Sequence, residues 1–322
     1  MQLQSELSRQ ISVIQSAMRE TPITEIAEPD MNLFVKLEHC NMIGSSKDRS
    51  ALWMLKSAVE RGELDAETTI IESSSGNVAL ALASFCRLLG LPFVPVIDPN
   101  ISSFNESALR AACEVVVKVE ERDDTGGYLK TRLAKVKELC NSSRRAYWTN
   151  QYSNRDNMLG HFHLTAGEIC RSFSQLDFVF VAVSTAGTIA GISRRLKERF
   201  PGVKVIAVDA EGSVAFGGKP KKRYLPGVGS SITPDLLSLA LIDDVVIVPE
   251  IVTAEACREL FYKHGLFLGA SSGTVYAAIK RYAPRMRGPR KPNVLFLSPD
   301  RGTAYVSTVY NDAWVSQYLA VS

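Results

Sequence analysis

The chain repeats one local pattern three times: an apolar segment, a short loop of Ser, Thr and Gly, and then a helical segment. The three loops are Ser73–Asn77, Ser184–Thr188 and Gly269–Thr274. In a parallel α/β sheet, such loops lie at the carboxyl ends of strands, where helix N-termini present N–H groups to bound ligands. The repeated pattern therefore predicts an α/β fold whose ligands bind at several of these loops.

A fourth stretch places a lysine at the start of a helix. Asn41–Arg49 contains a Gly-Ser turn, and either Ser45 or Ser46 is a suitable N-cap for a helix that begins beside Lys47. The positive end of the helix dipole disfavours a charged lysine and favours the free amine, which Schiff-base chemistry needs. Taken alone, the stretch is more typical of a solvated surface turn. The three loops that follow it in the chain change that interpretation.

Strand and helix patterns alternate along most of the 322 residues, a length that suits about two domains. This alternation predicts parallel sheets with helices on both faces, and a polar segment indicates a domain boundary near residue 146. We expect strands at 33–38, 69–72, 92–97, 114–119, 178–183, 203–209, 244–248 and 293–297, and helices at 1–20, 47–61, 78–89, 103–112, 127–141, 158–173, 189–200, 253–264 and 273–282.

The composition narrows the functional class. A hydrophobic share of 46% and a charged share of 22% are ordinary for a globular protein, and a net charge of +3 is too small to indicate nucleic acid or a membrane surface as partner. No apolar run is long enough to span a bilayer. The six cysteines are scattered without a C-x-x-C pair, which favours the cytoplasm. We expect no metal site, because His161 and His163 have the spacing of a helix-surface pair.

The four stretches, taken in order, resemble the fold type II (β-family) pyridoxal-phosphate enzymes, to which cysteine synthase and cystathionine β-synthase belong. The matching motifs are N-x-x-G-S-x-K-D-R, S-S-G-N, a Ser/Thr/Gly loop and G-x-S-S-G, and the resemblance covers nearly the whole chain. It implies pyridoxal 5'-phosphate as cofactor, a homodimer, and two doubly wound parallel-sheet domains. In this family the first forty or so residues cross over to the second domain. The expected division is a smaller domain at 41–145, and a larger, cofactor-binding domain at 1–40 plus 146–322.

The resemblance also implies a role for each matching residue. Lys47 would join the aldehyde of the cofactor and later act as the base at Cα of the substrate. Ser271 would meet the ring nitrogen, and Asn77 would bind the phenolic oxygen. The phosphate would be held by Ser184, Thr185, Ala186, Gly187 and Thr188, and the substrate carboxylate by Ser74, Ser75, Asn77 and Gln151.

Two of these positions carry chemical information. A Ser at position 271 cannot keep the ring nitrogen protonated as a carboxylate would, so a long-lived carbanion is disfavoured. This suits β-elimination from an activated L-serine to an α-aminoacrylate, followed by addition of a nucleophile at Cβ. In the phosphate loop, Ser184 and Ala186 replace two glycines of the usual G-T-G-G-T, which reduces the freedom of the backbone.

Val78, Tyr152 and Ser184 depart from the usual cysteine synthase pattern. Five stretches look closer to a narrower branch, the N-(2-amino-2-carboxyethyl)-L-glutamate synthases: Gly126–Arg132, Ala146–Tyr152, Val208–Val214, Leu225–Gly229 and Pro299–Gly302. The branch joins O-phospho-L-serine to the amine of L-glutamate and supplies 2,3-diaminopropionate for siderophores or peptide antibiotics. Both substrates are anionic, and Arg132 and Tyr152 would bind them. Two alternatives stay open: a cysteine synthase that uses O-acetyl- or O-phosphoserine, and a catalytically silent partner-binding protein on the same fold.

Overall fold

The computed structural model describes residues 2–124 and 126–319. The contacts divide the chain into two compact units: unit 1 is Met1–Arg19 with Lys47–Gly160, and unit 2 is Glu20–Ser46 with His161–Ser322. Residues 1, 125 and 320–322, which belong to the expected domains, lie outside the described residues.

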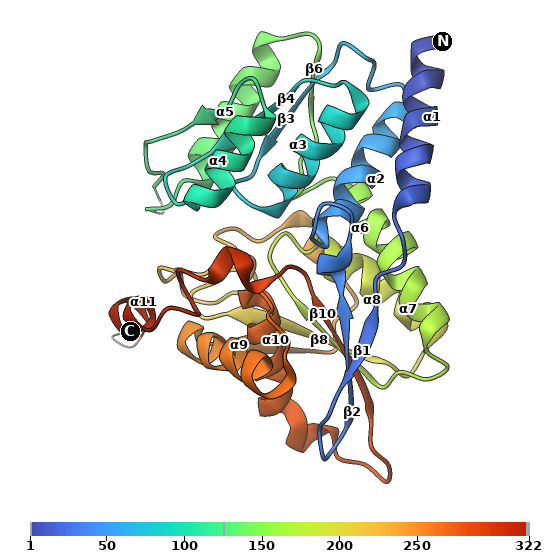
Figure 1. Cartoon of the computed structure of the whole chain (residues 1–322), viewed down its shortest axis with the longest axis vertical. Helices are drawn as coiled ribbons and strands as arrows, with labels where there is room; N and C mark the ends of the chain where they lie inside the picture. The colour runs from blue at the N-terminus through green and yellow to red at the C-terminus, as the bar shows by residue number, and fades with distance from the viewer. Residues whose placement is uncertain (1, 125, 320–322) are drawn as a thin grey trace. The chain divides into compact units, whose positions relative to one another are not determined.

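In its described residues, unit 1 is built on a four-stranded sheet in the order β5-β4-β3-β6, and every neighbouring pair of strands is parallel (Figure 1). Ile71 and Val96 of the sheet share a buried cluster with Val136 of α5. Its elements are α1 (Gln2–Ala17), α2 (Lys47–Glu60), β3 (Thr69–Ser73), α3 (Asn77–Leu89), β4 (Phe93–Ile97), α4 (Ser103–Ala112), β5 (Val117–Lys118), α5 (Leu129–Ser142), β6 (Ala146–Trp148) and α6 (Arg155–Gly160).

Unit 2 contains, in its described residues, a six-stranded sheet in the order β1-β2-β10-β7-β8-β9 (Figure 1). Its elements are β1 (Ile23–Ile26), β2 (Asn32–Leu37), η1 (Glu38–Cys40), η2 (a π-helix, His161–Thr165), α7 (Ala166–Ser172), β7 (Phe178–Ala182), α8 (Gly187–Arg199), β8 (Lys204–Ala210), η3 (Asp235–Leu239), β9 (Asp244–Val248), α9 (Glu250–His264), α10 (Ala270–Tyr282), η4 (Ala283–Met286), β10 (Asn293–Ser298), η5 (Gly302–Tyr305) and α11 (Asp312–Tyr318).

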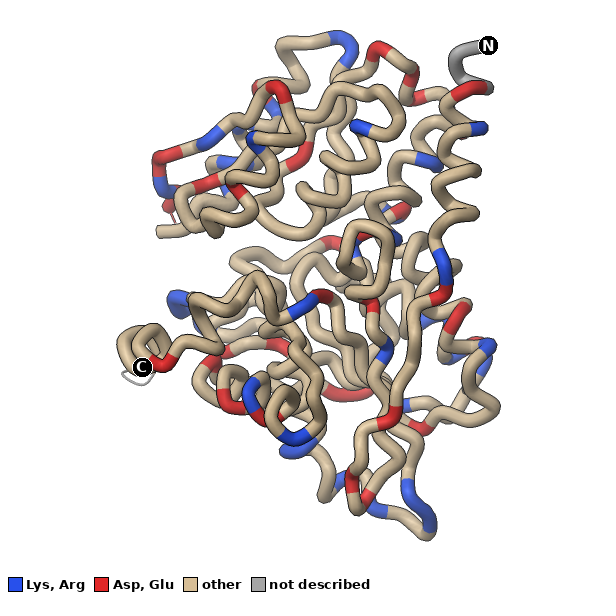
Figure 2. The backbone as a smooth tube through the Cα atoms, in the orientation of Figure 1, with Lys and Arg blue, Asp and Glu red and all other residues tan. Residues whose placement is uncertain are grey.

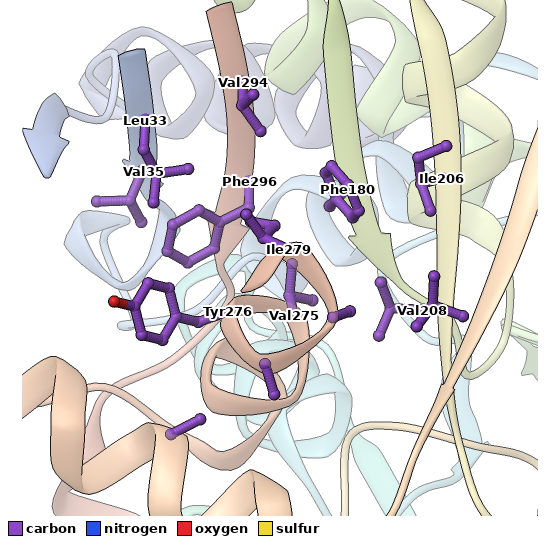
Figure 3. Close-up of a cluster of buried hydrophobic side chains, with 14 of the residues drawn as sticks. Leu33, Val35, Phe180, Ile206, Val208, Val275, Tyr276, Ile279, Val294 and Phe296 are labelled. Carbon is purple, nitrogen blue, oxygen red and sulfur yellow. The ribbon is translucent and has the colours of Figure 1, made fainter. Parts of the chain in front are cut away.

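Helices cover both faces of the unit 2 sheet. Successive residues of β7 point to opposite faces: Phe180 packs with Tyr276 of α10, and Val179 packs with Ile189 of α8. Figure 3 shows the first of these clusters, with side chains of α10 pointing toward the strands. Strands buried on both faces are typical of doubly wound parallel sheets, so the predicted α/β class is confirmed. One difference is β1, which pairs antiparallel with β2.

The boundaries between the units differ from the expected ones at two places. Helix α1 packs on α2, so residues 1–19 belong to unit 1, and only Glu20–Ser46 cross to unit 2, where β2 pairs with β10. Strand β6 pairs with β3, which keeps residues 146–160 in unit 1. The division near residue 146 therefore moves to residue 160, because a strand and a helix follow the polar segment before the chain changes units.

The helix expected at 158–173 also differs, since it is interrupted by the π-helix η2. His161 is completely buried at the start of η2, whereas His163 is exposed. The expectation that these two residues form a helix-surface pair is therefore wrong for His161.

Charged residues of both signs are interspersed in each unit, as Figure 2 shows. In the described part of the chain, no helix combines the length and apolarity that crossing a membrane requires.

Candidate functional site

In unit 2, the loop between β7 and α8 has the features of an anion site. The residue that precedes α8, Ala186, adopts the left-handed conformation (φ +65°), and no side chain of the described residues caps the helix there. The N–H groups of a first helical turn have no partners within the helix itself, and they favour a negatively charged ligand. The Gly229 amide donates to the Val183 carbonyl (2.7 Å) and fixes the start of the loop.

Three hydroxyl-bearing residues of this loop add to the backbone donors. Thr185 is buried, whereas Ser184 and Thr188 are partly exposed. Hydroxyl groups and helical N–H groups together suit a phosphate. The structure therefore places all five predicted phosphate-loop residues in one segment at the N-terminus of α8.

The Thr188 hydroxyl has a buried partner that the sequence did not indicate. Nε2 of His161 lies 3.2 Å from Oγ1 of Thr188, and Nδ1 of the same ring lies 3.0 Å from Oγ1 of Thr165. A buried imidazole thus bridges two threonine hydroxyls, one of which belongs to the candidate phosphate loop. The π-helical turn that begins at His161 breaks the regular helical spacing, which is why periodicity did not single this residue out.

Ser271 lies in the first turn of α10 and is only 3% exposed. A Cβ added at Gly227 (φ +93°) would lie 3.8 Å from Cβ of Ser271, so the Gly227 loop passes close to this residue. The next residue, Ser272, has a buried hydroxyl with no hydrogen-bond partner among the described residues. This helix start presents a neutral hydroxyl that is suited to a neutral ring nitrogen.

In unit 1, Lys47 is the first residue of α2 and is partly buried, which agrees with its expected place at the mouth of a helix. The neighbouring Ser46 amide donates to the Pro299 carbonyl (2.8 Å) within unit 2. The buried Ser46 hydroxyl has no partner among the described residues, so Ser46, one of the two N-cap candidates, does not cap α2.

The predicted carboxylate loop of unit 1 is organised by a buried acid that the sequence analysis did not single out. Glu72, at the end of β3, accepts hydrogen bonds from the Thr149 hydroxyl (2.5 Å) and from the amides of Ser73 (2.8 Å) and Gln151 (3.2 Å). The side chain of Gln151 donates back to the Ser73 carbonyl (3.2 Å). Complete burial raises the pKa of the Glu72 carboxyl, and these hydrogen bonds oppose the shift.

Further residues that were predicted to bind the substrates lie near Glu72 in the sequence or beside Gln151. Ser74 is buried in the loop after β3, Asn77 is the first residue of α3, and Tyr152 lies partly buried beside Gln151. Asn77 stands at a helix start, where a carboxylate is favoured, and Ser74 lies in the loop that leads to it.

Arg132 of α5 also reaches this loop. Its Nη1 donates to the Ser75 hydroxyl (3.3 Å), and its Nε forms an ion pair with Oδ2 of Asp98 (3.0 Å) whose alignment is poor for a hydrogen bond. The side chain of Arg132 is only 13% exposed. It is therefore not a freely solvated residue on a helix surface, which was the alternative interpretation of its position. Asn105 of α4 donates to the Ser75 carbonyl (3.1 Å) from another side. Neither Asp98 nor Asn105 was singled out from the sequence, since only the tertiary fold brings them to Ser75.

The residues present fit pyridoxal phosphate. Unit 2 offers an uncapped helix N-terminus with hydroxyls for a phosphate and a buried Ser271 for a ring nitrogen, and unit 1 offers a primary amine at Lys47. Among the described residues, no three or more His, Cys, Asp and Glu side chains are grouped to hold a metal ion.

Comparison with known proteins gives consistent results. A family model described as "Pyridoxal-phosphate dependent enzyme" matches residues 14–300. The N-(2-amino-2-carboxyethyl)-L-glutamate synthase of Ralstonia nicotianae is 43% identical over 305 residues, which are 93% of this chain and 90% of that protein. The enzyme of the same name from Cupriavidus metallidurans is 40% identical over 315 residues, or 96% and 92% of the two chains.

The crystal structure of an O-acetylserine dependent cystathionine β-synthase from Helicobacter pylori is similar with a TM-score of 0.86 and 30% identity, and the match covers 92% of this chain and 98% of that one. The resemblance inferred from the four motifs is confirmed by these matches.

Proposed function

Because this chain belongs to the pyridoxal-phosphate dependent enzymes, we propose that it replaces the phosphate of O-phospho-L-serine with the amine of L-glutamate. The Cβ–O bond to phosphate breaks, a Cβ–N bond to glutamate forms, and the products are N-(2-amino-2-carboxyethyl)-L-glutamate and inorganic phosphate. The names of the two relatives support this product, and with it L-glutamate as the amine. The product would supply 2,3-diaminopropionate for a siderophore or a peptide antibiotic.

Pyridoxal phosphate, when bound, withdraws electrons from the substrate Cα and makes its proton acidic. Lys47 provides the amine that holds the cofactor, and the same amine removes and returns the proton at Cα. The loop Ser184–Thr188 would bind the phosphate, and the Ser271 hydroxyl would donate a hydrogen bond to the ring nitrogen without charging it. Ser74, Ser75, Asn77 and Gln151 bind the α-carboxylate of the substrate.

The observation that carries the choice of substrates is the contact between Arg132 and Ser75. A guanidinium has five donors, so Arg132 keeps donors for an anionic group after it serves Asp98 and Ser75. Sulfide is a small nucleophile that needs no cationic side chain to bind it. Phosphoserine carries a phosphate and glutamate carries a second carboxylate, and each of these anionic groups needs a cationic or hydroxyl partner. The partly buried Tyr152 supplies a further hydroxyl.

A competition experiment tests this proposal. The holoenzyme is mixed with O-phospho-L-serine, L-glutamate and sulfide together, and the products are identified by mass. We expect the serine–glutamate adduct. Cysteine as the sole product would instead make the chain a cysteine synthase, which remains the second candidate because the same four loops serve both reactions. If the purified protein takes up no pyridoxal phosphate, the chain is instead a catalytically silent partner-binding protein on the same fold.

A variant pair tests the role of Arg132. We expect Arg132→Ala to raise the KM for phosphoserine or glutamate about tenfold or more, since a charge-assisted hydrogen bond contributes about 1.5–3 kcal/mol. Cofactor affinity stays unchanged. Lys130→Ala is the matched control, because Lys130 lies on the same helix but is paired with Asp124 at the surface. Equal kinetics in the two variants would leave Arg132 without a substrate role.

We further propose that the enzyme acts as a homodimer in the cytoplasm. This assignment is supported by the resemblance to the family. Light scattering after size-exclusion chromatography tests the dimer, and cell fractionation tests the compartment.

A further inference from the structure

His161 is a completely buried side chain with hydrogen-bond partners on both ring nitrogens, and the proposed mechanism does not use it. Nδ1 lies 3.0 Å from Oγ1 of Thr165, and Nε2 lies 3.2 Å from Oγ1 of Thr188. Thr165 ends the π-helix η2 and Thr188 is the second residue of α8. The imidazole therefore connects the interior of unit 2 with the loop at the start of α8.

The chemistry of a bound phosphate decides the direction of these hydrogen bonds. A hydroxyl donates one hydrogen bond, and an anionic phosphate oxygen only accepts, so Thr188 must direct its proton toward the phosphate. Its oxygen is then an acceptor on the other side, which requires a proton on Nε2 of His161. In the neutral ring, Nδ1 then carries no proton and accepts from the Thr165 hydroxyl.

We propose that His161 is a positioning residue that orients the Thr188 hydroxyl as a donor to the cofactor phosphate. The inference rests on the proposed place of the phosphate at Ser184–Thr188. The relay runs from the Thr165 hydroxyl through the imidazole to the Thr188 hydroxyl, so each group donates to the next and the last donates to the phosphate. Without Nε2–H, Thr188 is free to turn its proton toward other acceptors, and the loop loses a fixed donor.

The local fold supports this role. The π-helical turn widens the backbone at His161–Thr165, and such turns occur often at functional sites. It directs one histidine inward and leaves the other, His163, exposed. Thr188 is partly exposed, whereas the ring that contacts its hydroxyl is completely buried, so the hydroxyl is held from the interior of unit 2.

Binding of two forms of the cofactor separates positioning from a general structural effect. The stripped protein is reloaded with pyridoxal phosphate or with pyridoxal, which lacks the phosphate, and both affinities are measured by absorbance. We expect His161→Ala to weaken pyridoxal phosphate binding about tenfold, as loss of one hydrogen bond near a charged group does, and to leave pyridoxal binding unchanged. The ³¹P resonance of the reloaded cofactor should shift as well.

Three further variants complete the test. His161→Gln keeps a side-chain N–H donor and most of the volume, so it should return affinity to within about threefold of the wild type. On a Thr188→Val background, His161→Ala should cause no further loss, because the two residues act as one unit. His163→Ala, at the exposed neighbour, should change neither affinity nor the ³¹P resonance.

The outcomes are distinct. An unchanged affinity and ³¹P resonance in His161→Ala would overturn the proposal, and so would an equal loss for pyridoxal and pyridoxal phosphate. If His161→Ala does not fold, Thr165→Val, which removes only the donor to Nδ1, should still weaken pyridoxal phosphate binding selectively, and no selective loss would refute the relay. If the wild type itself binds both forms equally, the placement of the phosphate at this loop fails, whatever His161 does.

Discussion

Gly160 ends α6 where this helix packs on the first turns of α2, the helix that begins with Lys47. A Cβ built at Gly160 would lie 2.8 Å from the carbonyl oxygen of Arg49, 3.0 Å from Cβ of Trp53 and 3.1 Å from Cα of Ser50. Each of these atoms is part of the backbone or attached directly to it. A change of side-chain rotamer therefore does not relieve the overlap, and α2 and α6 must move apart.

The cost of Gly160→Ala follows from this geometry. Overpacking in a well-packed region typically costs about 1–3 kcal/mol, and three tight contacts with rigid atoms place this variant toward the upper end, at about 2–3 kcal/mol. Arg49 is only two residues from Lys47, so the displacement reaches the amine. A misplacement of about 1 Å is enough to lower kcat by about a hundredfold.

Urea unfolding followed by far-UV circular dichroism measures the change in stability, and kcat with saturating substrates measures the displacement of Lys47. Gly202→Ala is the matched control, because no heavy atom lies within 4 Å of the Cβ it would add and its backbone has no positive φ. We expect a lower urea midpoint and a lower kcat for Gly160→Ala alone. If both variants unfold at the same midpoint, the packing of α6 on α2 is not as rigid as we describe.

Two further variants test the loops directly. Ala186→Gly should raise the free energy of unfolding by about 0.5–1 kcal/mol, because Ala186 holds a left-handed conformation (φ +65°) that costs an L-residue about 1–2 kcal/mol; a less stable variant in thermal melts would contradict this. Glu72→Gln tests the buried carboxyl, whose pKa in the folded protein is raised by burial above its ordinary range. The contribution of such a carboxyl to the free energy of unfolding is fully present below its pKa in the unfolded chain and is lost as the pH rises through its pKa in the folded protein. The wild type should therefore lose stability relative to Glu72→Gln as the pH increases above about 4.3, the ordinary pKa of a glutamate. Parallel urea titrations at several pH values measure the difference, and a constant difference would show that Glu72 does not titrate in that range.

Local sequence patterns were sufficient for most of the fold. Strand β9 lies at the predicted residues, 244–248, because a run of four β-branched residues between two aspartates and a proline is unambiguous. The phosphate-loop residues fall at a strand end and a helix start because their hydroxyls and glycines mark that junction. These signals depend only on neighbours in the chain.

The remaining features depend on distant contacts. Helix α1 joins unit 1 because it packs on α2, and its own sequence carries no sign of that partner. The burial of His161 depends on a π-helical turn, which leaves no distinct pattern of apolar residues. Arg132 meets Ser75, 57 residues earlier in the chain, only because α5 packs against β3.

The most direct test of the account is to locate the covalent link to the cofactor. The holoenzyme is reduced with borohydride, digested, and mapped by mass spectrometry, with the Lys47→Ala variant treated in parallel. The account predicts a pyridoxyl group on the peptide that contains Lys47, and none in the variant. A pyridoxyl group on another lysine, or β-replacement activity retained by Lys47→Ala, would contradict the assignment of the catalytic amine.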